Sequence, residues 1–260
     1  MAGEQGAQDL LAAQDGPVLT LTLNRPDHRN AMSPAIVAGL SERIAGAAEA
    51  GVRVIVVTGA GDKAFCAGAD LQTGKSFQYA PSPRAPYANL LRLGRTCTVP
   101  IVGRINGTCV AGGMGILGIC DIAIAADHAK FGLPEVKVGV FPMQVLAVLQ
   151  HLVPRRRLIE LCLTGELIGA QEALSLGLLN RVVTTAELDG AVRRTIDSLL
   201  AAAPTALARG KYAMAAIEAM SFDESIAFLE GQIGLQALTE DAKEGMAAFR
   251  EKRKPNWPAR

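Results

Sequence analysis

The sequence of 260 residues is short of several residue types, and each shortage excludes a class of protein. The formal net charge is only +1, so the chain has no general attraction for nucleic acid or for an anionic membrane. Its three histidines have no metal-ligand spacing, and neither HExxH nor CxxC occurs, so no metal site is indicated. Aromatic residues make up 4% of the chain, while alanine and glycine abound, and this favours close packing of small side chains.

The sequence also lacks paired cysteines, a signal peptide and a membrane-spanning segment. The cysteines are Cys66, Cys97, Cys109, Cys120 and Cys162. An odd number without paired spacing is typical of buried thiols in a reducing compartment and not of a disulfide framework. The N-terminus, MAGEQGAQDL, lacks the basic region and apolar core of a signal peptide, and apolar runs are broken before they reach membrane-spanning length. We therefore expect a cytoplasmic protein without a membrane partner.

Half of the residues are hydrophobic and one fifth are charged, the balance of a globular protein with one large domain or two small ones. Four β-branched or alternating segments predict strands: PVLTLTLNRP, VRVIVVTG, IVGRING and CDIAIAAD. Between the first two, Ser33 and Pro34 predict the start of a helix that ends before Gly51. This alternation favours an α/β fold with parallel strands joined by helical crossovers.

The remaining segments are read from composition and period. Residues 1–15 are interpreted as a mobile leader, and residues 73–86 as a surface loop. From Pro142 onward the pattern is helical, up to a last long segment, DESIAFLEGQIGLQALTEDAKEGMAAFREKR, with one short strand in NRVV.

The segment INGTCVAGGMGILGICD, residues 105–121, places five glycines in an apolar run. The three glycines from Gly113 to Gly118 match the GxGxxG fingerprint of dinucleotide-binding sites. Glu135 follows about 20 residues later, where that fingerprint has its ribose-binding acid. However, a helix beginning at Gly113 has only about two turns before the next strand, shorter than the crossover helix of that fold. Dinucleotide binding is therefore a weak interpretation.

Two other interpretations use these glycines as bare backbone. They let a short helix pack tightly, or they leave its first N–H groups, which have no intrahelical partner, open to a ligand oxygen. The segment TGAGDKAFCAGADLQ, residues 58–72, also follows a predicted strand and ends in small residues, Ala67-Gly68-Ala69. Two such elements could supply converging N–H donors for an oxyanion that develops during a reaction.

Five segments of the chain resemble the crotonase superfamily, the enoyl-CoA hydratase/isomerase family, in order and with familiar spacing. They are AFCAGADL, NGTCVAGGMGILGICDIAIAAD, FGLPEVKVGVFP, LTGELIGAQEALSLGLLNRVV and EGMAAFREKRKPNW. The resemblance runs from about Pro17 to the C-terminus. It implies an α/β fold, a spiral of ββα units, with a core at residues 16–200 and a helical region at residues 201–260 that forms homotrimers or dimers of trimers.

The resemblance implies that the substrate is an acyl-CoA thioester and that no cofactor besides the CoA of the substrate is needed. The N–H groups of Ala69 and Gly112 match the pair that holds the thioester oxygen as it becomes an enolate. The carbonyl of Ala67 matches the acceptor for the adenine amino group of CoA. Arg25 and Arg29 match basic positions that face the nucleotide.

Four further residues are assigned to CoA binding by the same resemblance. Asp70 and Leu71 belong to the AGADL motif. Phe249 and Lys252 match residues that a neighbouring subunit supplies in family trimers. The basic tail also has a simpler explanation as an ordinary solvated helix end, where cations are favoured.

Hydratases of the family use two glutamates, and this chain resembles a member with one. Glu135, in the PE of FGLPEVKVG, is present, whereas the position three residues beyond the oxyanion glycine is Gly115, which has no side chain. Outside this motif, Glu135 would be interpreted as a surface acid that begins a short helix after Pro134.

The segment VFPMQVLAVLQHL also departs from the hydratase pattern, because it lacks the glycine-rich turn and Thr-Gln-Arg. We expect its apolar Met143, Val145 and Leu146 to shape the acyl pocket beside Gly115, with Gln144 as the nearest polar group. No aspartate occurs in this segment, which argues against the dehalogenase branch of the superfamily.

One carboxylate can take a proton from one carbon and return it to another through a dienolate, so we favour Δ3-Δ2 enoyl-CoA isomerisation by Glu135. An apolar neighbourhood that raises the pKa of Glu135 would help this exchange. A hydratase in which another acid, such as Asp70 or Glu166, positions the water stays open. So do another enolate reaction such as decarboxylation and a non-catalytic acyl-CoA-binding protein.

Overall fold

The computed structural model describes residues 9–70 and 85–259, whose strands form two sheets. The larger has the strand order β1-β2-β3-β5-β7-β10, and the smaller has the order β4-β6-β8-β9. The larger sheet consists of β1 (Leu10–Asp15), β2 (Val18–Leu23), β3 (Val54–Gly59), β5 (Ile101–Ile105), β7 (Ile122–Ala126) and β10 (Arg181–Val183). The smaller consists of β4 (Ala64–Cys66), β6 (Thr108–Val110), β8 (Lys130–Gly132) and β9 (Leu167–Gly169).

The predicted α/β class with parallel strands is confirmed by the larger sheet. Its strands β2, β3, β5, β7 and β10 pair in parallel, and β1 is antiparallel to β2. The four segments predicted as strands are β2, β3, β5 and β7 at the centre of this sheet. The predicted leader is wrong over Leu10–Asp15, because these residues pair along their whole length with Val18–Leu23.

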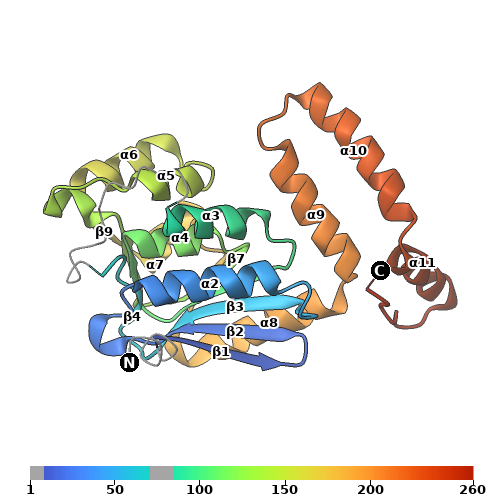
Figure 1. The fold of residues 1–260 in the computed structure, drawn as a ribbon, viewed down its shortest axis with the longest axis horizontal. Helices are drawn as coiled ribbons and strands as arrows, with labels where there is room; N and C mark the ends of the chain where they lie inside the picture. Colours follow the sequence, from blue (N-terminus) through green and yellow to red (C-terminus); the bar gives the residue numbers. More distant parts are fainter. Residues whose placement is uncertain (1–8, 71–84, 260) are drawn as a thin grey trace.

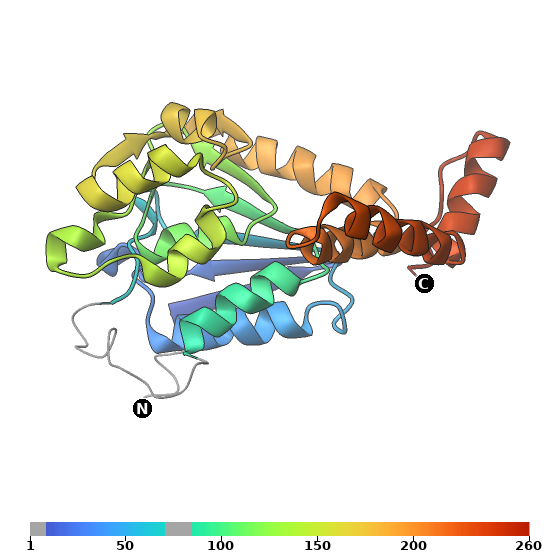
Figure 2. The same cartoon turned by 90° about the horizontal axis from the view of Figure 1, so that it is seen from above.

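Helices cover both faces of the larger sheet and continue into the C-terminal part of the chain (Figures 1 and 2). They are α2 (Pro34–Gly46), α3 (Pro86–Thr96), α4 (Gly112–Gly118), α5 (Met143–Leu149), α6 (Arg155–Thr164), α7 (Ala170–Ser175), α8 (Leu188–Ala201), α9 (Pro204–Ile217), α10 (Phe222–Ala237) and α11 (Glu240–Glu251). Short 3-10 helices are η1 (Pro26–His28), η3 (Pro134–Val138) and η4 (Thr185–Glu187).

Strand β3 explains why the centre of the sheet is apolar at every position. Its side chains alternate between two cores, with Val54 and Val56 packing toward α8 and with Ile55 and Val57 facing the main core. Because helices cover both faces, neither set of side chains meets water, and all six positions of the strand are buried.

Local sequence signals predicted some helix ends correctly and missed others. The Ser33 hydroxyl accepts the N–H of Ile36, and Pro34 is the first residue of α2, as predicted, although the helix ends at Gly46 instead of continuing toward Gly51. The last helical segment divides at Thr239, whose hydroxyl accepts the N–H of Ala242 and so begins α11. Strand β9 was not predicted, since only three residues pair there.

The last three helices extend from the body of the molecule as an arm (Figures 1 and 2). Helices α9 and α10 contain no buried residue. Large apolar side chains of the arm are exposed, among them Met214, Phe222, Ile233, Leu238, Met246 and Phe249. Several large apolar side chains exposed on neighbouring helices are typical of a contact surface.

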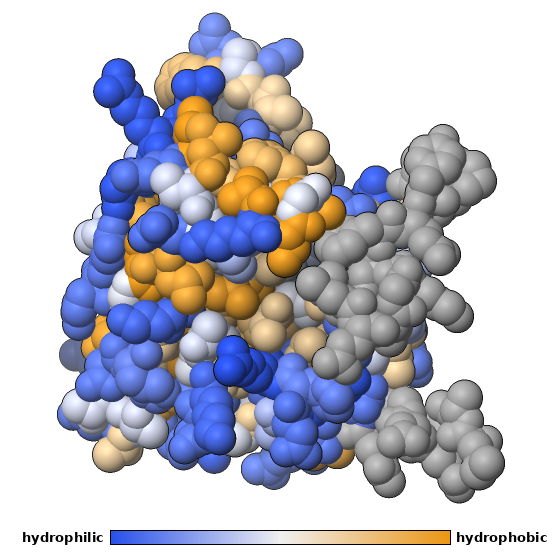
Figure 3. Space-filling view, turned by 90° about the vertical axis from the view of Figure 1, so that its left-hand side faces the viewer, coloured by the Kyte–Doolittle hydropathy of each residue, from blue (hydrophilic) through white to orange (hydrophobic). Residues whose placement is uncertain are grey.

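At the end of the molecule where α5, α6 and β9 lie, apolar residues gather in a patch bordered by hydrophilic ones (Figure 3). Exposed apolar side chains on these elements and on the neighbouring η3 are Val138, Met143, Leu163 and Leu167. Across the described ranges, no helix is long and apolar enough to cross a membrane.

Two buried asparagines join the larger sheet to the smaller one. The side chain of Asn106 accepts the N–H of Gly59 at 3.0 Å and donates to the carbonyls of Gly61 at 2.8 Å and Ala64 at 3.2 Å. The Asn30 side chain donates to the same Ala64 carbonyl at 2.7 Å. These bonds fix the start of β4, the strand that leads to the predicted oxyanion residue Ala69.

We expect Asn106→Ala to lower the free energy of unfolding by about 2–3 kcal/mol. The Gly59 N–H and the Gly61 carbonyl would lose their bonds to the Asn106 side chain, whereas the Ala64 carbonyl would keep its bond from Asn30. Urea denaturation measures this change. Asn256→Ala, at an exposed asparagine, is the control and should stay within about 0.5 kcal/mol of the parent. Equal stability of the two variants would show that Asn106 does not hold this junction.

Candidate active site

The smaller sheet brings together three segments that are far apart in the sequence. Strand β4 pairs in parallel with β6, and β6 pairs in parallel with β8. Since the carboxyl ends of parallel strands meet at one edge of a sheet, the residues after β4, β6 and β8 emerge side by side. These are residues 67–70, 111–113 and 133–135, which include Ala69, Gly112 and Glu135.

The amides of Ala69 and Gly112 lie close together, as the resemblance implied. A Cβ placed on Gly112 would be 3.7 Å from the amide nitrogen of Ala69, and one placed on Gly68 would be 3.2 Å from the amide nitrogen of Gly112. Within the described part of the chain, neither amide donates a hydrogen bond. The structure thus brings close together the two amides that are predicted to share a ligand oxygen.

Tertiary contacts hold this pair of turns in place. Met32 bridges to Ala69, since its N–H donates to the Gly68 carbonyl at 2.7 Å and its carbonyl accepts the N–H of Asp70 at 3.1 Å. On the other side, the Ala111 N–H donates to the Gly132 carbonyl at 3.0 Å. Ala111 has φ 52°, a strained value for a residue with a side chain.

The glycines of residues 105–121 prove to have more than one purpose. A Cβ on Gly113 would lie 2.5 Å from the Cys66 carbonyl oxygen, and one on Gly118 would lie 2.8 Å from the Val148 side chain, so these two permit packing. Gly112 instead leaves the backbone bare beside Ala69. The packing interpretation is therefore confirmed for Gly113 and Gly118, and the interpretation of N–H groups open to a ligand stays a prediction for Gly112.

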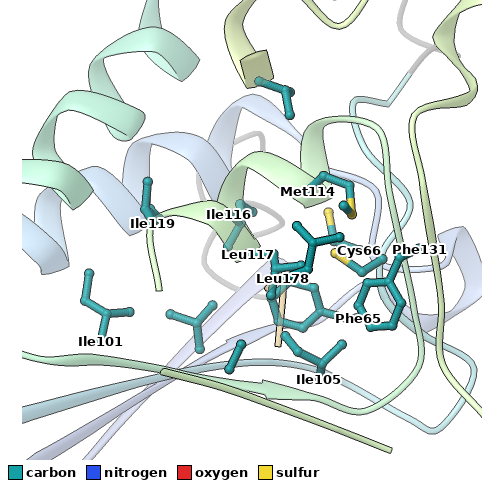
Figure 4. Packing of buried hydrophobic residues seen from close by; sticks show 14 of the residues in the cluster. Phe65, Cys66, Ile101, Ile105, Met114, Ile116, Leu117, Ile119, Phe131 and Leu178 are labelled. Carbon is teal, nitrogen blue, oxygen red and sulfur yellow. The ribbon is translucent and has the colours of Figure 1, made fainter. Parts of the chain in front are cut away.

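Helix α4, which follows the turn of residues 111–113, is buried in the core. Its side chains Met114, Ile116 and Leu117 are at most 1% exposed, and Figure 4 shows them among Phe65 and Phe131. The helix has seven residues, which agrees with the two turns expected and excludes the long crossover helix of a dinucleotide-binding unit.

Glu135 is buried and is not the surface acid of the alternative interpretation. Its side chain belongs to η3, begun by Pro134, and the residue is 8% exposed. Among the residues that the structure describes, its Oε2 atom is buried without a hydrogen-bond partner. Burial raises the pKa of Glu135 above its usual value of 4.5, against a lowering contribution from its own backbone N–H.

Tyr87, at the start of α3, is a site residue that the sequence analysis missed. Its hydroxyl donates to the Gly112 carbonyl at 2.5 Å. The Glu135 carboxylate is near enough to contribute to raising the pKa of this phenol, after the larger effect of burial. The Tyr87 hydroxyl is thus bonded to the turn of residues 111–113. No local sequence signal marks it, because the contact joins residues that are 25 positions apart.

The predicted nucleotide-binding residues are partly occupied by contacts within the chain. The Arg25 guanidinium is 2.8 Å from the Asp70 carboxylate and donates to the Ala31 carbonyl at 2.9 Å. Arg29 is exposed, and its backbone carbonyl accepts the N–H of Ala67 at 3.1 Å, so the backbone of Arg29 lies beside the predicted adenine acceptor. Leu71 lies outside the described residues.

Four predicted residues lie at the surface. Met143 is 71% exposed and Gln144 is exposed, whereas Val145 points into the core. Phe249 is 86% exposed, and Lys252 ends α11 with φ 53°. Because α11 belongs to the arm, at the opposite side of the molecule from α4 and α5 (Figure 1), these two do not reach the oxyanion turn of their own chain.

The raised pKa of Glu135 makes a prediction about stability. A carboxyl that is harder to ionise in the folded protein favours folding below pH 4.5 and disfavours it as the pH rises through the folded-state pKa. We expect Glu135→Gln to melt at a higher temperature than the parent at about pH 7 and at the same temperature at about pH 4. Thermal unfolding at the two pH values measures this; a variant less stable at neutral pH would contradict it.

Comparison with known proteins extends over almost the whole chain. The sequence model of the family described as enoyl-CoA hydratase/isomerase matches residues 13–260. The chain is 35% identical over 246 residues to (E)-benzylidenesuccinyl-CoA hydratase of Thauera aromatica, covering 92% of this chain and 94% of that protein. It is 35% identical over 274 residues to enoyl-CoA hydratase EchA19 of Mycobacterium tuberculosis, covering 100% of both.

Solved structures show the same fold. An enoyl-CoA hydratase of Mycobacterium smegmatis matches with a TM-score of 0.88 at 32% identity, covering 96% of this chain and 98% of that one. An enoyl-CoA hydratase of Bacillus anthracis matches with a TM-score of 0.89 at 29% identity, covering 97% and 100%. Since sequence pattern and fold agree along the chain, this protein belongs to the enoyl-CoA hydratase/isomerase family, enzymes of the crotonase superfamily.

Proposed function

We propose that this enzyme is a single-glutamate Δ3-Δ2 enoyl-CoA isomerase. The observation that carries the proposal is the buried carboxylate of Glu135, whose Oε2 has no hydrogen-bond partner among the described residues and which follows β8, next to the turns that hold the Ala69 and Gly112 amides. The position of the second glutamate of hydratases is Gly115, which is buried against Tyr87. One base next to an oxyanion hole is sufficient to move a proton between two carbons of an acyl-CoA.

The reaction follows from this geometry. The amides of Ala69 and Gly112 donate to the thioester oxygen, and the Glu135 carboxylate removes a proton from C2 of the 3-enoyl group. The electrons form a dienolate whose negative charge rests on the oxygen held by the amides. The protonated Glu135 then returns the proton to C4, which yields the conjugated 2-enoyl thioester. A raised pKa suits this step, because the same group must both accept and release the proton near neutral pH.

We assign coenzyme A recognition to the turn of residues 67–70 and to the arginines near it. The Ala67 carbonyl is proposed to accept from adenine, with exposed Arg29 beside it for the phosphates. Arg25 is already paired with Asp70, so its proposed role is to hold the AGAD turn and add a partly neutralised positive charge. The apolar patch at α5 and α6 supports an acyl group near Met143, with Gln144 at its edge (Figure 3).

The arm supports assembly into trimers or dimers of trimers. Its exposed apolar side chains need a cover, and a second copy of the arm would provide one. In such an assembly Phe249 and Lys252 would reach the CoA of a neighbouring subunit. The five free cysteines, of which Cys66 has its pKa raised by burial to about 12, support the expected cytoplasmic location.

A hydratase is the second candidate, because the relatives that are 35% identical carry that name. The two acids suggested as helpers receive no support from the structure. Asp70 is paired with Arg25, and Glu166 is exposed on the surface. A hydratase would therefore have to activate water with Glu135 alone.

The assay that separates these functions offers a 3-enoyl-CoA and, separately, a 2-enoyl-CoA. We expect conversion of the 3-enoyl thioester to the conjugated product, seen by its ultraviolet absorption, to exceed hydration of the 2-enoyl thioester. Glu135→Gln should lower the isomerisation rate about 10²–10⁴-fold, the usual contribution of a general base. Faster formation of 3-hydroxyacyl-CoA would favour the hydratase, and no turnover of either would favour a binding protein.

The oxyanion hole is tested by Gly112→Ala. The added methyl would lie 3.7 Å from the Ala69 nitrogen, in the space for the thioester oxygen, and 2.6 Å from the flexible end of Met32. We expect kcat/KM to fall about 10²–10³-fold, with little change in melting temperature. Gly210→Ala, on α9 where a Cβ meets nothing within 4 Å, is the control. Full activity of Gly112→Ala would contradict the assigned oxygen position.

A further inference from the structure

The place of a side chain at position 115 is taken by a residue from another helix. A Cβ on Gly115 would overlap the Tyr87 hydroxyl oxygen, and it would lie 3.1 Å from the Tyr87 Cζ and 3.2 Å from the Leu91 side chain. Helix α3 therefore fills the space above the first turn of α4. The structure has no room for an acid at position 115 while Tyr87 is present.

The Tyr87 hydroxyl has one proton to donate, and the Gly112 carbonyl accepts it. The donor and acceptor oxygens are 2.5 Å apart, so the bond restrains the peptide that follows the oxyanion amide. Burial, then the thiols of Cys66 and Cys109 and the Glu135 carboxylate, raise the pKa of the phenol well above its usual value of 10. The group therefore stays neutral in the working range of pH and is a poor base toward water.

We propose that Tyr87 is the specificity-determining residue of this site, occupying the place of the second carboxylate and positioning the oxyanion amide of Gly112. The proposal rests on the isomerase function proposed above. With a neutral phenol in place of a carboxylate, position 115 offers no second base toward water, which favours transfer of a proton by Glu135 between two carbons of the acyl group. The hydroxyl is a positioning group, because it acts on the substrate through the backbone of Gly112.

The positioning role is tested with Tyr87→Phe, which keeps the ring and removes the hydrogen bond. We expect kcat for isomerisation to fall about tenfold with KM within about twofold of the parent. A bound 2,4-dienoyl-CoA, whose absorption moves to longer wavelength as its carbonyl is polarised, should show a smaller shift in this variant. The control is Tyr212→Phe, a half-exposed tyrosine on α9. If both variants behave alike in rate and spectrum, the positioning role is wrong.

The exclusion of a second acid is tested with Gly115→Glu, alone and combined with Tyr87→Ala. In the parent background the new side chain meets Tyr87, and we expect isomerisation to be lost without any gain of hydration. In the double variant the space is free, and hydration of a 2-enoyl-CoA should rise at least about tenfold above the parent. Equal hydration by the single and double variants, or none by a folded double variant, would overturn the proposed exclusion.

The outcomes separate this inference from the proposed function. If the parent enzyme does not isomerise a 3-enoyl-CoA, the proposed function fails before any variant is compared, and the inference falls with it. If the parent isomerises but Tyr87→Phe matches Tyr212→Phe, the inference alone fails. Should the double variant not fold, the Tyr87→Phe comparison still decides the positioning role.

Discussion

The structure depends on one close approach of two backbone turns, the end of β4 against the end of β6. Gly68 makes it possible, because a Cβ there would lie 2.7 Å from the Ala111 side chain and φ +89° suits only glycine. Gly113, the residue after Gly112, permits the same close approach, because a Cβ there would overlap the Cys66 carbonyl. This contact aligns the amides of Ala69 and Gly112, and the parallel pairing with β8 adds Glu135 beside them. In the proposed mechanism catalysis needs little motion, because both amide donors are in place before charge develops on the thioester oxygen.

The turns of residues 67–70 and 111–113 are supported by buried or half-buried polar groups on neighbouring segments. The Asn106 and Asn30 side chains anchor the start of β4, and the Arg25–Asp70 ion pair anchors its end. The Tyr87 hydroxyl restrains the opposite turn. These polar groups are buried or half-buried and hydrogen-bonded to backbone, so each fixes a loop that an apolar side chain could only fill.

Local sequence signals predicted the fold class, the four central strands and the Ser33 cap, because alternating β-branched residues and cap residues act over a few positions. They also indicated the oxyanion pair and Glu135, through motifs that the family resemblance made specific. The leader over Leu10–Asp15 was interpreted wrongly, because LLAAQD has no β-branched residue and no alternation, although the Asp15-Gly16 pair marks the turn into β2. Tyr87 was missed because its contact with Gly112 exists only once α3 folds over α4.

The surface residues show a second limit of sequence reasoning. Phe249 and Lys252 stay predictions for a site made with another subunit, and Met143 stays a prediction for the acyl pocket. The exposure of Phe249 and Lys252 in a single chain follows from the fold, since the arm leaves the body after α8 (Figure 1), whereas Met143 is exposed on α5. Burial of such side chains depends on a partner surface, and the period of one helix does not show which copy provides it.

The central claim is that one thioester oxygen binds between two main-chain amides with a lone carboxylate at its side. A crystal structure with a saturated acyl-CoA bound tests it most directly. The account predicts the thioester oxygen at about 3 Å from the amide nitrogens of both Ala69 and Gly112, with the Glu135 carboxylate facing C2 and C4 of the acyl chain. A thioester oxygen held by other groups, or an acyl chain that leaves Glu135 on its far side, would contradict it.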